Sequence, residues 1–172
     1  MKIKSTDINS HYLTKKLVNS ISNLDVVKPI KNQKEIEFTK KILLPLMKEI
    51  YKEEVKIGLV IKGPVNPVKD KFFRGDYFSD ITLSLNRERL IAVEVKLLKK
   101  SKKRHQNLST AIGQSVIYTM GKFKQAILIV IDERLDVNIE EIEKLRNKLF
   151  KSNVVFLYFN HSSIDKYIRF IN

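Results

Sequence analysis

The chain is predicted to fold as an α/β (α+β) domain with a central mixed β-sheet flanked by α-helices. Two strand-like segments, residues 78–85 and 89–97, are separated by a short turn at 86–88, which predicts an antiparallel hairpin. Two later segments, residues 125–131 and 154–159, contain almost no polar side chain and are typical of buried strands. Each of these is preceded by a helix-like segment, and a hairpin followed by alternating helices and strands predicts a mixed sheet with helices on its faces.

The N-terminal third of the chain has mainly helical periodicity. Apolar residues recur at helical spacing in residues 7–23, which predicts a first helix. A second apolar stripe predicts a helix over residues 33–52, and Pro45 inside it should kink or divide that helix. Residues 55–61 alternate between apolar and other side chains, which predicts a strand.

The C-terminal half completes the alternation with three further helices. They are expected at residues 108–121, at the acidic segment 138–151 and at residues 162–170. A length of 172 residues suits one domain. We expect a helical extension over residues 1–30 and a core domain over residues 31–172.

The charge of the chain is strongly one-sided. There are 33 Lys and Arg residues against 19 Asp and Glu residues, a formal net charge of +14. Lys and Arg bind polyanions by releasing the counterions of phosphate groups, so a nucleic acid is the favoured partner. A lysine-rich compositional bias is an alternative, but such a bias usually raises the glutamate content as well. An anionic membrane surface is a weaker alternative.

Several classes of site are excluded by residue content. The chain has no cysteine, which excludes disulfides, cysteine-ligated zinc and a cysteine nucleophile. His11, His105 and His161 are far apart in the sequence and form no local metal-ligand pair. The N-terminus lacks the apolar stretch of a secretory signal, and the longest plainly apolar run, residues 126–131, is too short to cross a bilayer. We therefore expect a cytoplasmic protein without a membrane partner.

The residues that carry chemistry are concentrated in the predicted hairpin. Period-two alternation places Glu94 and Lys96 on one face of the second strand, and pairing of the hairpin brings Asp80 near Glu94. Two adjacent carboxylates repel each other unless a cation neutralises them, and oxygen ligands suit Mg²⁺ or Mn²⁺. The backbone carbonyl of Val95 is a candidate further ligand. Such a cation would activate water towards a phosphodiester, while Lys96 would position that water or stabilise the developing negative charge.

This arrangement resembles the PD-(D/E)XK nuclease superfamily, which includes restriction endonucleases and archaeal Holliday-junction resolvases. The matching residues are Asp80, Glu94 and Lys96, and Ser79 stands where the family frequently has proline. The resemblance implies a restriction-endonuclease-like core and Mg²⁺-dependent hydrolysis of DNA.

The resemblance also implies two accessory residues. Members of the superfamily often carry a glutamine on the helix after the lysine strand, and Gln114 fits that role, with Tyr118 one turn further along the same face. They also often carry a glutamate on the first core helix. Glu35 lies nearer the apolar stripe than Glu37 and is the preferred candidate.

Two other features near the predicted site suggest contacts with nucleic acid. Aromatic residues precede Asp80, and they could contact bases, although core packing or loop anchoring is the more common use of such residues. A run of basic residues follows Lys96 and is expected to hold phosphates, a mobile solvated loop being the alternative. The aromatic residues are Phe72, Phe73, Tyr77 and Phe78, and the basic residues are Lys99, Lys100, Lys102, Lys103 and Arg104.

The leading hypothesis is a metal-dependent endonuclease that hydrolyses phosphodiester bonds in DNA. Nearly all of the chain belongs to the core, which favours structure-directed cutting or nicking over recognition of a long sequence. By analogy with small members of the superfamily, a homodimer is expected. The alternative is a non-catalytic nucleic-acid-binding module that retains the nuclease fold. A structural or interaction domain with compositional basicity is a third hypothesis.

Overall fold

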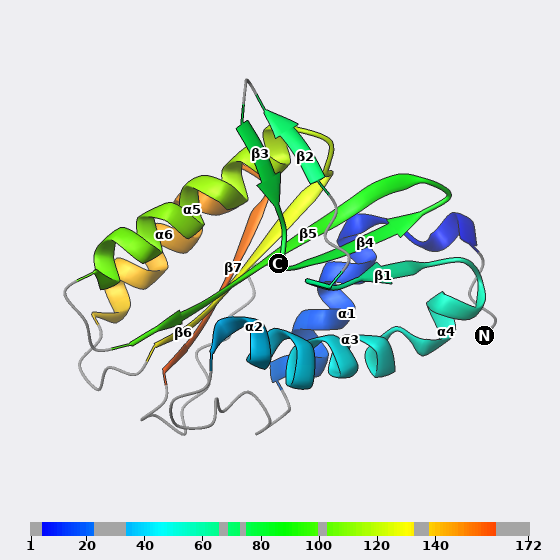
Figure 1. Cartoon of the computed structure of the whole chain (residues 1–172), viewed down its shortest axis with the longest axis horizontal. Coiled ribbons are helices and arrows are strands. Elements are labelled where there is room, and N and C mark those ends of the chain that lie inside the picture. Colours follow the sequence, from blue (N-terminus) through cyan, green and yellow to red (C-terminus); the bar gives the residue numbers. More distant parts are fainter. Residues whose placement is uncertain are drawn as a thin grey trace.

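The computed structural model describes residues 5–22, 34–65, 69–72, 75–99, 103–132 and 138–160. Its centre is a five-stranded sheet in the order β1-β4-β5-β6-β7 (Figure 1). The pairs β1–β4 and β4–β5 are antiparallel, whereas β5–β6 and β6–β7 are parallel. The expected mixed sheet flanked by helices is therefore confirmed. The strands are β1 (Val60–Lys62), β4 (Ile81–Leu85), β5 (Glu88–Leu98), β6 (Gln125–Asp132) and β7 (Val154–Asn160), and a separate two-stranded ribbon consists of β2 (Lys69–Phe72) and β3 (Gly75–Phe78).

Helices cover both faces of the sheet. On one face, α5 (Arg104–Met120) and α6 (Ile139–Phe150) form the parallel crossovers and pack on one apolar cluster. On the other face, α1 (Ser10–Ser22) and the helical region that contains α3 (Leu44–Ile50) pack on a second cluster. β6 illustrates the consequence, because alternate residues of this strand belong to the two clusters and almost all of it is buried. The shorter helical segments are the 3-10 turn Ser5–Asp7, α2 (Glu35–Phe38), the π-helical turn Thr39–Leu43 and α4 (Lys52–Lys56).

The first helix is part of this core. Leu13, Leu17 and Val18 of α1 are fully buried in the same cluster as the strands. The expected division after residue 30 falls within residues 23–33, and the expected helix 162–170 also lies outside the described residues. In the part of the chain that the structure describes, no helix combines the length and the apolar character that a membrane crossing requires.

The strand expected at residues 55–61 is wrong over most of its length. Residues Lys52–Lys56 form α4, and only Val60–Lys62 form a strand. Gly58 has a φ of +105°, and its N–H donates to the carbonyl of Val55, so the chain turns sharply after the helix. Period-two alternation of apolar residues was misleading here, because a one-turn helix and a short strand share the segment.

Pro45 was expected to kink or divide the second helix, and the structure instead shows a widened turn directly before it. Proline has no N–H and its ring clashes with the carbonyl four residues earlier. The helix contains a π turn over Thr39–Leu43 directly before Pro45, and the Leu44 N–H donates to the carbonyl of Thr39. The extra residue in this turn accommodates the proline without ending the helix.

The predicted hairpin is confirmed, and its first strand is divided. β4 and β5 are joined by Asn86 and Arg87, both with positive φ, as in the tight turns that match strand twist. Residues 78–85 do not form one strand, because β3 ends at Phe78 and β4 begins at Ile81. The bend at Ser79 and Asp80 lets β3 leave the main sheet and pair with β2 (Figure 1).

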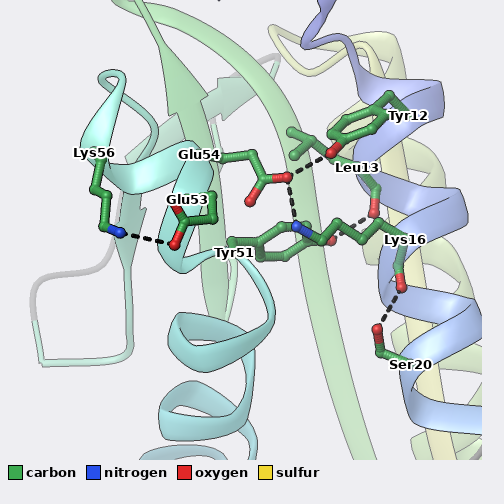
Figure 2. A network of polar contacts seen from close by, with 8 residues as sticks. All are labelled: Tyr12, Leu13, Lys16, Ser20, Tyr51, Glu53, Glu54 and Lys56. Atoms are coloured by element: carbon green, nitrogen blue, oxygen red, sulfur yellow. Dashed lines mark hydrogen bonds and ion pairs between the residues drawn. The ribbon is translucent and has the colours of Figure 1, made fainter. Parts of the chain in front are cut away.

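A buried polar network ties α1 to α4 (Figure 2). The Oε1 atom of Glu54, a fully buried residue, accepts hydrogen bonds from Tyr12 Oη and Lys16 Nζ, each at 2.6 Å. Burial alone would raise the pKa of Glu54, but these two donors outweigh it and lower the pKa. Tyr51 Oη also donates to the Leu13 carbonyl at 2.6 Å. The network thereby holds the first helix against the region that leads into the sheet.

We expect Glu54→Ala to lower the free energy of unfolding by about 2–4 kcal/mol, because Lys16 and Tyr12 lose their buried acceptor. Glu53 lies in the same first turn of α4 and forms an exposed pair with Lys56 at 2.7 Å (Figure 2). Glu53→Ala is therefore the matched control and should cost less than about 0.5 kcal/mol. Urea unfolding of both variants measures the difference, and equal losses would contradict the role given to Glu54.

Candidate active site

The candidate site lies where β5 extends beyond its antiparallel partner. The first paired residues of β4 and β5 are Ile81 and Val93, so residues 94–98 of β5 have no partner on that side in β4. Asp80 directly precedes β4, and its Oδ2 accepts a hydrogen bond from the Val95 N–H at 2.8 Å. A side chain thus replaces the backbone acceptor that a longer β4 would have provided.

Glu35 supplies the hydrogen-bond acceptor for the next outward-facing N–H group of the same edge, that of Leu97. Its Oε2 accepts a hydrogen bond from the Leu97 N–H at 3.1 Å, and its Oε1 accepts one from Lys96 Nζ at 2.8 Å. Glu35 is the first residue of α2, which therefore lies against the free edge of β5. The structure thus brings Glu35 to Lys96, whereas Glu37 makes its side-chain contact with the backbone of Lys34.

Glu94 is buried on the face of the sheet that α5 covers. It is only 5% exposed, and Tyr118 Oη lies 3.0 Å from its Oε2. The same hydroxyl donates to the carbonyl of Phe78 at 2.9 Å. Sequence reasoning placed Tyr118 on the face of Gln114 but gave it no role, because helical spacing does not reveal a hydrogen bond to a distant strand.

The two carboxylates are held in an environment that disfavours their charges. Burial raises the pKa of Asp80 to about 6, and the charge of Glu35 adds to this, although the Val95 N–H and Lys96 oppose it. Burial and the charge of Asp80 raise the pKa of Glu94 to about 8, against the opposing effects of Tyr118 and Lys96. The two carboxylates therefore repel each other, and Lys96 compensates them only in part.

Lys96 is the cation of this cluster. Partial burial alone would lower the pKa of Lys96, but the hydrogen bond to Glu35 and the charges of Glu35, Glu94 and Asp80 raise it. The lysine is therefore protonated at neutral pH. Its side chain is 18% exposed, so the ammonium group is held by protein and remains accessible from solvent.

The ligands available for a metal ion are the carboxylates of Asp80 and Glu94 and the carbonyl of Val95. In a strand, the N–H and C=O of one residue point to the same side, so the Val95 carbonyl faces the free edge beside Asp80. Among the described residues, no group of three or more His, Asp or Glu side chains is arranged to hold a metal ion. The two carboxylate oxygens of Glu35 accept hydrogen bonds from Lys96 and Leu97.

The remaining predicted residues are distributed unevenly. Gln114 is half-buried on α5, one helical turn before Tyr118, and no contact in the described residues joins it to the carboxylates. Lys99 and Lys103 are exposed, whereas Lys100 and Lys102 lie outside the described residues.

Arg104 was expected to contact phosphates, and its position contradicts this. The side chain is 6% exposed and forms an ion pair with the fully buried Asp132, to which Tyr158 Oη also donates. The reason is that α5 begins at Arg104, four residues earlier than expected, so the end of the basic run turns inward as the first helical turn. Arg104 fastens the helix to the sheet.

Comparisons with protein-family models, with curated proteins and with solved structures found no significant match to the chain. The functional argument therefore rests on the residues and geometry of the site.

The pKa values predict an unusual dependence of stability on pH. Glu94 keeps its proton in the folded protein up to a pH of about 8, whereas in the unfolded chain it loses the proton near the ordinary value of 4.5. Unfolding therefore releases a proton between these values, so this group's contribution to stability decreases as the pH rises through that window. We expect Glu94→Gln to remove this component and to be more stable than the wild type at pH 9, by an amount on the order of a few kcal/mol.

Chemical unfolding between pH 5 and pH 9 tests this expectation. Glu88→Gln, at the exposed start of the same strand, is the control and should keep the wild-type dependence on pH. If Glu94→Gln and the wild type lose stability in parallel above pH 6, Glu94 is not held in a repulsive environment.

Proposed function

We propose that the protein is a Mg²⁺-dependent deoxyribonuclease with a restriction-endonuclease-like core of the PD-(D/E)XK type. The observation that carries the proposal is the pair of the half-buried Asp80 and the buried Glu94, whose charges interact with that of Lys96, at the free edge of β5. A purely structural charge cluster would be expected to be neutralised internally. Here burial, together with the smaller effect of neighbouring carboxylates, raises the pKa values of both carboxylates, and a bound cation would offset both effects.

The donor set fits a hard divalent cation. Two carboxylates and the Val95 carbonyl are oxygen donors, and Mg²⁺ commonly binds to one or two protein carboxylates while keeping several waters. When bound, the cation would supply Lewis-acid polarisation of the phosphodiester and a water of lowered pKa. Binding would also favour the ionised forms of Asp80 and Glu94, which the folded protein alone disfavours.

Lys96 has a role that its own geometry supports. Because it stays protonated, it acts as a hydrogen-bond donor and a positive charge, and it is not available as a base. Held by Glu35, it can donate to a phosphate oxygen on which negative charge develops in the transition state. Glu35 thus positions Lys96 and does not itself bind the cation.

The charge of the chain supports DNA as the substrate. The net charge is +14, and the exposed Lys99 directly follows the strand that carries the site. Lys103 is exposed just before α5, and Lys34 is exposed directly before Glu35. These cations lie next in the sequence to the elements that carry the site and would hold phosphates of the bound DNA. Because each chain carries one such site, cleavage of both strands of a duplex favours a homodimer.

We expect the purified protein to cut DNA in Mg²⁺ or Mn²⁺ and not in EDTA. Asp80→Asn and Lys96→Ala should each lower the cleavage rate by at least about 100-fold. Supercoiled plasmid, single-stranded DNA and a four-way junction would be tested in parallel by gel electrophoresis, so that the preferred substrate separates junction cleavage from general nicking.

Two controls keep this experiment interpretable. Lys56→Ala removes an exposed lysine far from the site in sequence and should leave the rate unchanged. Asp80→Asn keeps an acceptor for the Val95 N–H and relieves the repulsion with Glu94, so loss of activity in this variant cannot be ascribed to unfolding. Equal DNA binding in EDTA with no cleavage of any substrate would instead identify a non-catalytic nucleic-acid-binding module.

A further inference from the structure

One aromatic side chain next to the candidate active site is exposed. Phe78 is 48% exposed, although a phenylalanine normally gains stability by burial. Of the phenylalanines whose exposure the structure describes, Phe38, Phe123 and Phe156 are buried, and Phe150, at the end of α6, is exposed like Phe78. Phe78 lies two residues before Asp80, so its exposure needs an explanation that involves the site.

The ribbon of β2 and β3 accounts for the direction of this side chain. Successive residues of a strand point to opposite faces, and Tyr77 packs against the cluster beneath α5. Phe78 therefore lies on the outer face of the ribbon, opposite Lys69 in the register of the two strands. The ribbon is a sheet separate from the five-stranded one, and the exposure of Phe78 shows that solvent reaches this outer face.

The backbone of Phe78 is fixed to the carboxylate cluster. Tyr118 Oη contacts both the Phe78 carbonyl, at 2.9 Å, and Glu94 Oε2, at 3.0 Å. The Tyr118 hydroxyl group thus bridges the Phe78 carbonyl oxygen and Glu94 Oε2. Along the chain, Phe78 is separated from Asp80 by one residue. The backbone that carries the aromatic ring is therefore held close to the residues that would act on a phosphodiester.

The chemistry of this face favours a base over a phosphate. Lys69 Nζ lies 2.6 Å from Asp76 Oδ2, so the charged groups beside Phe78 compensate each other. What the face offers is an aromatic surface, on which any nucleobase can stack. In a continuous duplex both faces of each base are already stacked, so only an unpaired or displaced base can use this surface.

We propose that Phe78 is a base-stacking residue that directs the site to DNA with unpaired bases next to the scissile phosphate. The proposal rests on the proposed nuclease function for its location and names the substrate class of that site. Single strands, flaps and gapped or branched junctions provide such bases, and an intact duplex does not. The exposed lysines near the site hold phosphates of any DNA, whereas Phe78 discriminates among DNA structures.

The experiment uses the absence of tryptophan from the chain. Phe78→Trp carries the only indole of the protein, and stacking on a base quenches its fluorescence. In EDTA, where no cleavage occurs, titration with an oligothymidylate should quench this variant strongly and saturably, and a long, fully paired duplex without loops or overhangs should not. Phe150→Trp is the matched control and should not be quenched by either DNA.

Affinity provides the second measurement. Phe78→Ala should weaken binding of the oligothymidylate by about 5- to 100-fold in fluorescence anisotropy and change binding of the duplex by less than about twofold. Phe78→Tyr should restore single-strand binding. Because the Phe78 carbonyl belongs to the backbone, these substitutions leave its hydrogen bond to Tyr118 in place.

The outcomes separate this proposal from the nuclease proposal. No quenching of Phe78→Trp at saturating single-stranded DNA, failure to bind single-stranded DNA, or equal losses on both DNAs in Phe78→Ala would overturn the stacking role. Quenching together with no metal-dependent cleavage would leave the stacking role standing and remove the nuclease. Metal-dependent cleavage that is unaffected by Phe78→Ala on every substrate would support the nuclease proposal and overturn the stacking role.

Discussion

The candidate site depends on one feature of the sheet, which is that β4 ends before β5 does. Beyond the pair of Ile81 and Val93, the N–H groups of Val95 and Leu97 face an edge at which, among the described residues, no further strand pairs with β5. The carboxylates of Asp80 and Glu35 satisfy these two groups. An unpaired buried N–H costs free energy comparable to a lost hydrogen bond. Two carboxylates at this edge are therefore stabilised there, because they supply acceptors for backbone N–H groups. Glu94 then adds a third acid from the strand, and Lys96 can compensate only part of the charge.

The rest of the fold makes this edge rigid. The central strands β5 and β6 are buried on both faces by helices, and α1 is fastened to α4 by the Glu54 network. On the opposite face, the buried pair of Arg104 and Asp132 fixes the start of α5. Buried ion pairs and hydrogen bonds of this kind favour one packing arrangement, even where their net contribution to stability is modest. The packing of the core and of the helices around it therefore holds the carboxylates of Asp80 and Glu94 close together despite their mutual repulsion.

Much of this could be predicted from the sequence, because hydrophobic periodicity reports burial. The mixed sheet, the hairpin and the helices before β6 and β7 followed from alternation and apolar runs, and the proximity of Asp80 to the strand of Glu94 followed from hairpin pairing. Contacts between distant segments could not be predicted in this way. Arg104 appeared to belong to a basic surface run, and only its partner Asp132, on a distant strand, explains its burial. The exposure of Phe78 was equally hidden, because it depends on where β3 leaves the sheet.

Tyr118 links the end of β3 to the carboxylate cluster, because its hydroxyl group contacts both Phe78 and Glu94. A phenol has one proton, yet its oxygen lies within hydrogen-bonding distance of two acceptors, the Phe78 carbonyl and Glu94 Oε2. The phenol is the donor in both contacts, so its one proton is shared between the Phe78 carbonyl and Glu94 Oε2. Its hydrogen bond to Glu94 opposes the rise in the pKa of Glu94 that burial and the charge of Asp80 cause. The anchoring of the Phe78 backbone and the electrostatics of the carboxylate cluster therefore depend on the same hydroxyl group.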